Sequence, residues 1–162
     1  MSNARRILLD TNILLDYIVP DRPHSSAAAT LVHMAGAESL TIFVTPGSLK
    51  DMYYIARKYI DEQTARQYIE LFLDLFVVLS VGQEACELAA RSDEPDFEDG
   101  LIRAVAEINS IDFIITRDRT AFQRSTVRSM SSDDYVHLFA QEKRQSLHIA
   151  DAHDEGGDEY PA

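Results

Sequence analysis

Four aspartates are the side chains of this sequence best placed to do chemistry together: Asp10, Asp51, Asp99 and Asp118. Two carboxylates about 5 Å apart repel by roughly 3 kcal/mol at an effective dielectric constant of 20, so four that converge must bind protons or cations. Oxygen ligands without cysteine or histidine suit Mg²⁺ or Mn²⁺ better than Zn²⁺. Such ions stabilise the charge that develops when water attacks a phosphodiester, and they activate that water. The chemistry that best fits a converging set is therefore metal-dependent hydrolysis of phosphoesters.

The elements expected around these aspartates are those of a parallel sheet. Apolar runs predict strands at residues 7–9, 40–44, 76–79 and 113–115, with a short fifth strand at 126–128. Helical spacing predicts helices at residues 11–17, 25–37, 48–60, 61–73, 83–92, 98–109 and 133–141. Strands that alternate with helices of this length are typical of an α/β fold. We therefore expect a three-layer α/β/α sandwich with a mainly parallel central sheet of four to five strands.

The four aspartates lie either just after a predicted strand or near the start of a predicted helix. Asp10 ends the first strand, Asp118 follows the fourth by a Thr-Arg step, and Asp51 and Asp99 lie near the starts of helices. In open parallel sheets, functional groups gather beyond the carboxyl ends of the strands. A single aspartate after a strand is often a plain helix cap, so the argument for a site depends on the whole set. Nearby polar residues that could support the carboxylates or a bound water include Asn12 and Thr116.

Asp96 has two readings because it precedes Asp99 by three residues. On one helix the two side chains would share a face. Alternatively, Asp96 is the N-cap of the helix and Asp99 occupies its third position. We take Asp99 as a metal ligand and Asp96 as a cap or supporting group.

Length and composition exclude several classes of protein. The 162 residues suit one domain, and Cys86 is the only cysteine, which rules out an internal disulfide framework. We find no signal peptide and no apolar run of the roughly 18–20 residues that a spanning helix needs, so a cytoplasmic protein without a membrane segment is expected. The formal net charge is −12, but five acids and no Lys or Arg fall within residues 146–162. We predict a domain over residues 1–145 and an acidic, disordered tail over 146–162.

Three segments, in order, resemble the motifs of the PIN domain family. The segment 8–16, Leu-Leu-Asp-Thr-Asn-Ile-Leu-Leu-Asp, looks like the opening strand and first acidic motif of that family. Residues 96–106, which begin Asp-Phe-Glu-Asp, resemble its third-acid helix. Residues 114–122, with Ile-Ile-Thr-Arg-Asp and then Phe122, resemble its final acidic motif. Each motif is short, but their shared order over about residues 6–138 makes the resemblance specific.

The resemblance implies a metal-dependent ribonuclease whose acidic pocket binds Mg²⁺ or Mn²⁺ and cuts RNA. It carries metal-binding roles to Asp10, Asp99 and Asp118, with Asn12 and Thr116 as supporting groups. Many members have Glu where this chain has Asp51, which is one methylene shorter. Many bacterial members are VapC-like toxins that a small antitoxin protein inhibits, and dimers are common in this fold, so the resemblance also implies an antitoxin partner and a homodimer.

Basic residues near the last motif could hold RNA despite the acidic composition. Arg117, Arg119 and Arg124 follow the fourth strand and are candidates for phosphate binding. The alternative is that they are surface arginines paired with the many acids.

Two further readings concern the activity itself. An aspartyl-phosphate phosphatase is disfavoured, because Asn12 lacks the acid that would protonate a leaving group. A catalytically inert PIN-fold binding or scaffold module remains the alternative to a nuclease, and Asp51 in place of Glu is its motivation.

Overall fold

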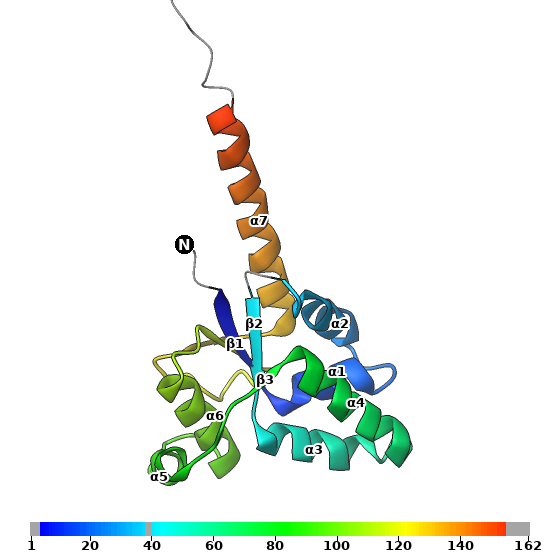
Figure 1. Cartoon of the computed structure of the whole chain (residues 1–162). Helices are drawn as coiled ribbons and strands as arrows, with labels where there is room; N and C mark the ends of the chain where they lie inside the picture. The colour runs from blue at the N-terminus through cyan, green and yellow to red at the C-terminus, as the bar shows by residue number, and fades with distance from the viewer. Residues whose placement is uncertain (1–3, 38–39, 155–162) are drawn as a thin grey trace, which may run out of the picture.

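A parallel five-stranded sheet organises the described part of this protein, residues 4–37 and 40–154 of a computed structural model (Figure 1). The strands are β1 (Arg5–Leu9), β2 (Leu40–Val44), β3 (Val77–Val78), β4 (Phe113–Ile115) and β5 (Arg128–Met130). Their order across the sheet is β3-β2-β1-β4-β5, and all four neighbouring pairs are parallel. The carboxyl ends of all five strands therefore point to one edge of the sheet.

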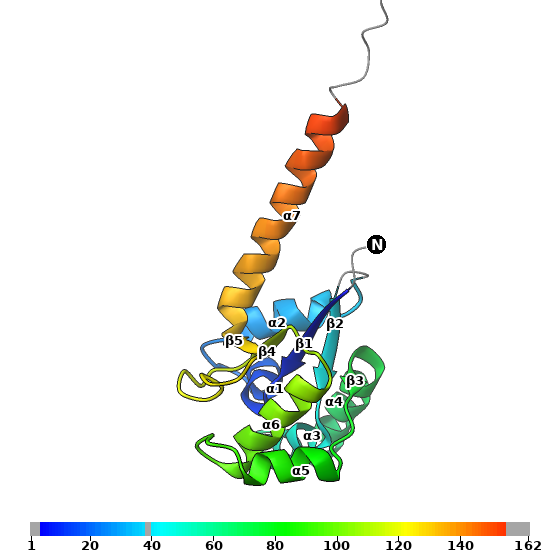
Figure 2. The same ribbon diagram turned by 90° about the vertical axis from the view of Figure 1, so that its left-hand side faces the viewer.

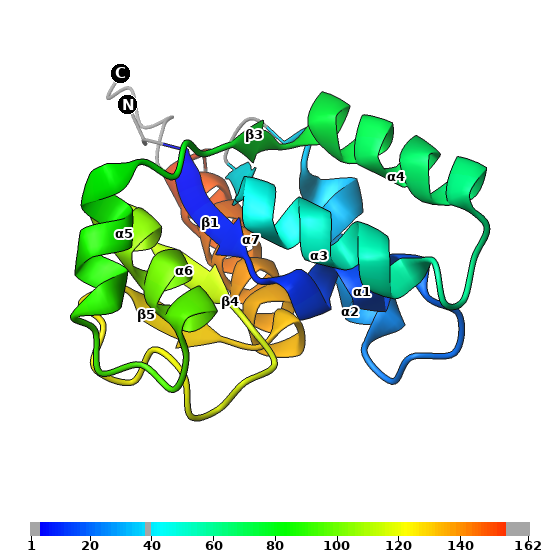
Figure 3. The same ribbon diagram turned by 90° about the horizontal axis from the view of Figure 1, so that it is seen from below.

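Seven helices in the described residues cover the two faces of this sheet. They are α1 (Thr11–Ile18), α2 (Ser25–Met34), α3 (Pro46–Ala56), α4 (Glu62–Leu75), α5 (Gln83–Ala90), α6 (Phe97–Ile108) and α7 (Ser132–Asp154). Viewed from below, α5 and α6 lie on one side of the sheet, and α1 to α4 lie on the other (Figure 3). The predicted three-layer α/β/α sandwich with a parallel sheet is confirmed.

Alternation along the strands divides the core in two. Ile7 and Leu9 of β1 point into a cluster with residues of α1, α2, α3, α4 and α7, whereas Leu8 points into a second cluster with α5 and α6. All three side chains are completely buried. A strand covered on both faces needs such an unbroken apolar run, which is why β1 was recognisable from the sequence.

Some element boundaries differ from the predicted ones. The fifth strand is Arg128–Met130 rather than 126–128. The helix after β2 begins at Pro46, and its N-cap is Thr45, whose side chain accepts a hydrogen bond from the Ser48 amide. Proline suits the first helical position because that position needs no amide hydrogen for the helix.

The final helix is longer than predicted and takes in the start of the expected tail. It runs from Ser132 to Asp154, beyond the predicted end at residue 141, and rises away from the sheet (Figure 2). The helix therefore includes residues 146–154 of the predicted tail, while residues 155–162 lie outside the described part of the chain. No Gly or Pro occurs between 132 and 154 to stop the helix. No described helix is both long and apolar enough to cross a membrane.

Candidate active site

Sheet register brings Asp10 and Thr116 together at the carboxyl edge. Leu9 of β1 is paired with Ile115 of β4, so the next residue of each strand emerges beside the other. The Thr116 hydroxyl donates a hydrogen bond to Asp10 Oδ2 at 3.0 Å. Asp10 Oδ1 accepts one from the Thr11 amide at 2.7 Å, which makes Asp10 the N-cap of α1 as well. Asp10 is buried, with 8% of its surface exposed, so these hydrogen bonds fix an inward-facing carboxylate.

The first turn of α6 supplies the second predicted carboxylate. Asp96 is the N-cap of this helix, and its Oδ1 accepts a hydrogen bond from the Asp99 amide at 2.8 Å. Of the two interpretations of Asp96, the structure therefore agrees with the N-cap. Asp96 caps the helix through one oxygen, and Asp99 stays the predicted metal ligand of this turn.

Asp118 lies in the turn after β4 and is tied into it by one oxygen. Its Oδ1 accepts hydrogen bonds from the Thr120 amide, the Thr120 hydroxyl and the Ala121 amide. These hydrogen bonds hold the pKa of Asp118 below its usual value. The Asp118 amide in turn donates to Thr116 Oγ1 at 3.1 Å, so Thr116 connects Asp10 with Asp118. Asp118 is therefore the carboxylate of this group that stays ionised most readily.

Glu98 is a member of the site that sequence reasoning missed. Thr11 Oγ1 donates to Glu98 Oε1 at 3.3 Å and lies 3.1 Å from Ser48 Oγ, so α1, α3 and α6 meet here. The Glu98 carboxyl group also lies close enough to the Asp51 carboxyl group of α3 to have its pKa raised by it. The acidic first turn of α6 was the available signal, but the packing of α6 decides which of its acids faces Asp51. Asp51 itself is half-buried and pairs with Lys50 Nζ at 3.1 Å.

Repulsion among these acids shows that they share one electrostatic environment. Burial, followed by the charges of Asp96, Asp10 and others, raises the pKa of Asp99 to about 6. Partial burial, and then the contact with Asp51 and its charge, raises the pKa of Glu98 to about 7. Burial and the nearby charges of Asp118 and Asp96 also raise the pKa of Asp10. The site therefore attracts protons or cations, as expected for converging carboxylates.

The donor set fits a hard divalent cation by its chemistry. All the candidate ligands are carboxylate oxygens, supported by hydroxyl groups, which suits Mg²⁺ or Mn²⁺. A cation near Asp10 and Asp99 would offset the repulsion that raises their pKa values. In the side-chain positions of residues 4–37 and 40–154, however, no three acidic, His or Cys groups surround a common point closely enough to hold an ion. The residues therefore match a hard divalent cation in ligand type and charge. Their side chains do not surround a common point in this structure.

The predicted supporting and RNA-binding residues are distributed more widely than the sequence suggested. Asn12 is exposed on α1, and its side chain makes no hydrogen bond within the described residues. Arg117 Nη1 lies 3.1 Å from Oδ1 of Asp16, a fully buried residue. Arg124 pairs with Asp93. Arg119 lies beside a cavity next to Asp118.

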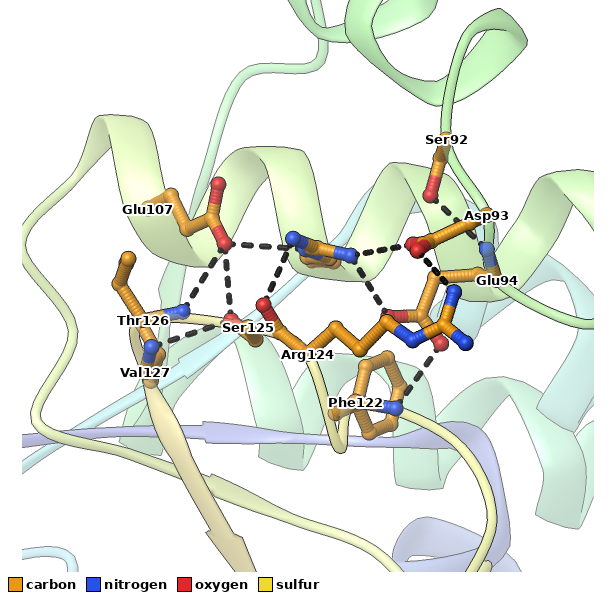
Figure 4. Close-up of polar contacts among 10 residues, drawn as sticks. Ser92, Asp93, Glu94, Glu107, Phe122, Arg124, Ser125, Thr126 and Val127 are labelled. Atoms are coloured by element: carbon orange, nitrogen blue, oxygen red, sulfur yellow. Dashed lines mark hydrogen bonds and ion pairs between the residues drawn. The ribbon is translucent and has the colours of Figure 1, made fainter.

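A network around Arg103 anchors the loop that carries Asp118 (Figure 4). The Arg103 guanidinium donates to Glu107, Asp93 and Glu94, and its Nη2 donates to the Arg124 carbonyl at 2.9 Å. Glu94 Oε2 accepts a hydrogen bond from the Phe122 amide at 2.9 Å.

The second half of the β4–β5 loop is therefore fastened to α6 and to the segment that precedes it. Phe122 has a positive φ of 66°, which a non-glycine residue adopts only where its surroundings hold it. It is buried, with 2% exposure, so the strained backbone is fixed by packing as well as by Glu94. The Arg103 network thereby sets the position of the turn that presents Asp118 and Arg119.

Comparison with known families identifies the family to which this chain belongs. The sequence model of the PIN domain family matches residues 6–120, well over half of the chain. The chain therefore belongs to the PIN domain family. The matched range includes all four predicted aspartates and Glu98. A comparison with curated protein sequences gave no match.

Solved structures share this fold at low sequence identity. VapC20 of Mycobacterium tuberculosis, described as a toxin that cleaves the sarcin-ricin loop, is 17% identical with a TM-score of 0.58, over 70% of this chain and 90% of its own. A toxin-antitoxin complex from Klebsiella pneumoniae contains a chain that is 22% identical with a TM-score of 0.59, over 78% of this chain and 97% of its own. VapBC2 of Rickettsia felis, bound to a promoter DNA fragment, gives 15% identity and a TM-score of 0.57, over 77% of this chain and 97% of its own. At these identities the likeness establishes the fold alone.

Proposed function

We propose that this protein is an endoribonuclease that hydrolyses RNA phosphodiester bonds with Mg²⁺ or Mn²⁺ held by its acidic edge. Membership of the PIN family, whose members are generally nucleases, supports the reaction class. The observation that carries the proposal is geometric: Asp10 and Asp118 are joined through Thr116 at the carboxyl edge of the sheet, where Asp99 of α6 lies near enough for the carboxylates to repel one another. A protein gains nothing in stability from such repulsion, so a functional role as a cation site is the better explanation.

The residues divide into ligands and groups that position them. Asp10, Asp99 and Asp118 would hold the ion, and Thr116 orients Asp10 through its hydroxyl. When bound, the ion stabilises charge on the phosphoryl oxygens and lowers the pKa of a water molecule. Asp51 and its neighbour Glu98 lie on the α3 side of the site, where they could accept the proton of the attacking water. In this proposal Glu98 supplies a second carboxylate beside Asp51, whose side chain is one methylene shorter than the glutamate common in the family.

The proposal is tested by RNA cleavage with matched variants. The full chain is incubated with a labelled single-stranded RNA in Mn²⁺, in Mg²⁺ and in EDTA. Asp10→Asn and Asp99→Asn are expected to lower the rate by about 100-fold or more, since each removes a ligand charge. Asp74→Asn, an exposed aspartate of α4, is the control and keeps the rate. Equal activity in the wild type and both ligand variants would show that the cleavage came from a contaminant.

The inert-module alternative makes a different prediction about metal binding. A ligand that binds the native state raises its stability by RT ln(1 + [L]/Kd). A nuclease site therefore predicts a higher Tm in millimolar Mn²⁺, and the rise should be lost in Asp99→Asn. No shift in the wild type, together with no cleavage, would favour a binding or scaffold module.

We further propose that the chain is a toxin with a protein antitoxin, and that it forms a homodimer. The structural neighbours that are toxin-antitoxin complexes support the partner. The expected result is growth arrest on expression of the wild type and not of Asp99→Asn, with a dimer mass in light scattering. A protein that leaves growth unaffected while cutting RNA in vitro would be a nuclease outside a toxin pair.

A further inference from the structure

A cavity of about 630 Å³ lies next to the acidic edge, between the β4–β5 loop and the start of α7. Its walls include Thr116, Asp118, Arg119, Arg128, Ser129 and Asp134. We call it the β4–α7 cavity. Its volume falls within the roughly 300–1,000 Å³ of small-molecule sites. Because Thr116 and Asp118 belong both to this cavity and to the acidic edge, an occupant of the cavity lies beside the proposed ligands.

Two arginines of the cavity are available for an anion. Arg119 and Arg128 are exposed, and neither forms an ion pair within the described ranges 4–37 and 40–154. Arg117 also lines the cavity, but its guanidinium is paired with buried Asp16. Arg124, in contrast, is held by Asp93 outside the cavity.

The rest of the wall contains polar groups that have hydrogen-bond partners of their own, together with the apolar side chains of Met130 and Leu138. The Asp134 amide donates to Ser131 Oγ at 3.1 Å, which caps the start of α7. Asp118 Oδ1 accepts hydrogen bonds from the Thr120 and Ala121 amides of its own loop, so this oxygen atom is not paired with the arginines of the cavity. The cavity thus combines the guanidinium groups of Arg119 and Arg128, which form no ion pair within the described residues, with hydroxyl groups and the carboxylates of Asp118 and Asp134.

We infer that the β4–α7 cavity binds the nucleotide that adjoins the scissile phosphate of a single-stranded RNA, with its phosphate on Arg119 and Arg128. The inference rests on the proposed ribonuclease function and adds a subsite to it. When the reacting phosphate of an RNA strand lies at the acidic edge, the next phosphate of that RNA is one nucleotide away. In this inference Arg119 and Arg128 bind that next phosphate. RNA is the occupant we choose over an acidic peptide because the cavity shares Thr116 and Asp118 with the edge proposed to hold the ion and the reacting phosphate.

Binding measured without turnover tests this subsite. The full chain with Asp99→Asn is titrated against a fluorescent single-stranded RNA at several salt concentrations, and fluorescence anisotropy gives Kd. Adding Arg119→Ala and Arg128→Ala is expected to weaken binding about tenfold or more. For single strands the slope of log K against log salt changes by about 0.7 per phosphate contact, so the slope should fall by about 1.4. An unchanged Kd and slope would overturn the inference.

Two further variants separate the subsite from general charge. Arg66→Ala with Arg144→Ala removes the same charge from exposed positions outside the cavity and is expected to change Kd less than threefold. Ser129→Tyr fills the cavity without changing charge and should also weaken binding. Equal losses in the Arg66/Arg144 control and the cavity variant would show long-range attraction only. Circular dichroism and Tm confirm that each variant is folded.

The outcomes distinguish this inference from the proposed function. If the wild type cleaves RNA but the Arg119/Arg128 variant keeps its KM, the function stands and the subsite is wrong. If the wild type does not cleave RNA but the arginines govern RNA binding, the subsite stands and the nuclease assignment is wrong. A poly-glutamate peptide that binds as tightly as RNA, through the same arginines, would overturn RNA as the occupant.

Discussion

The hydroxyl group of Thr116 donates a hydrogen bond to Asp10 Oδ2 across 3.0 Å and joins the carboxyl ends of two neighbouring strands. The same oxygen atom of Thr116 accepts a hydrogen bond from the Asp118 amide at 3.1 Å. One buried threonine therefore links two of the proposed metal ligands, which lie 108 positions apart in the chain. Its loss should disturb both ligands at once, although it is not itself a ligand.

Thr116→Val tests this link because valine has nearly the same shape without the hydroxyl. The Asp10 carboxylate would lose a donor in a buried setting, which costs about 1–3 kcal/mol of unfolding free energy. The hydrogen bond from Thr116 lowers the pKa of Asp10, so its loss should raise that pKa further. Urea denaturation measures the stability. Thr116→Ser, which keeps the hydroxyl, is the control, and a valine variant as stable as the serine variant would contradict the link.

The raised carboxyl pKa values predict how stability depends on pH when no divalent ion is present. Glu98, near 7, and Asp99, near 6, both lie above the roughly 4 of an unfolded chain. At pH values between the unfolded and the native pKa, the native state binds more protons than the unfolded state. The free energy of unfolding therefore falls as pH rises from 5 to 8.

Glu98→Gln isolates this effect, since glutamine stays neutral throughout. The variant's Tm should exceed that of the wild type by a margin that grows from pH 5 to pH 8 in EDTA. Thermal unfolding in a pH series measures it. A margin that is constant with pH would show that Glu98 is not strained by its neighbours. In the wild type, Mn²⁺ should also bind more tightly at pH 8, because the ion competes with these protons.

Arg103 is expected to be the most sensitive position of the loop anchor. Arg103→Met leaves the Glu94 carboxylate, whose side chain is only 4% exposed, without its cation. Breaking a fully buried pair costs roughly 3–5 kcal/mol, and we expect about 2–3 kcal/mol here because Arg103 keeps 20% exposure. Arg124→Ala breaks an exposed pair of the same network and should cost less than about 1 kcal/mol. Similar losses in the two variants would argue against a central role for Arg103.

Gly100 is predicted to be essential for the packing of α6 on α5. A Cβ atom at this position would meet the Ala89 carbonyl oxygen at 3.0 Å and the Ala89 Cα at 3.1 Å. Both are backbone atoms of α5, so the contact can be relieved only if α5 and α6 move apart. Gly100→Ala should therefore destabilise by about 1–3 kcal/mol, despite the roughly 1 kcal/mol that alanine gains in helix propensity. Gly36→Ala, with open space around it, is the control.

The projecting end of α7 is expected to contribute little to the stability of the domain. From Lys143 to Ala150 every residue is exposed, and Leu147 and Ile149 are 65% and 60% exposed. Deleting residues 146–162 should shift Tm by less than about 2 °C, as for changes at other exposed positions. Differential scanning fluorimetry measures the shift. A loss greater than roughly 5 °C would show that the domain does not end near residue 145.

Local sequence determined most of the elements and the carboxyl ends of the two strands that carry Asp10 and Thr116. The unbroken apolar runs of β1 and β4 specified buried parallel strands, and these runs stop where Asp10 and Thr116 begin. The Asp96 cap could be predicted as well, because capping links residues three apart in one chain segment. The end of α7 was missed, since the absence of Gly and Pro is a weaker signal than the loss of apolar periodicity.

Tertiary structure decided which charged groups meet. Whether Arg117 contacts Asp16 or a phosphate depends on the distance between α1 and the β4–β5 loop, and no local pattern encodes that distance. The same holds for Glu98, whose contact with Asp51 requires α3 and α6 to approach from opposite faces of the sheet. Carboxylates and guanidinium groups interact over several ångströms through space, so their partners are set by the packing of distant elements. The sequence by itself therefore predicted that acids gather at one edge of the sheet, and only the fold decided which charged groups contact one another there.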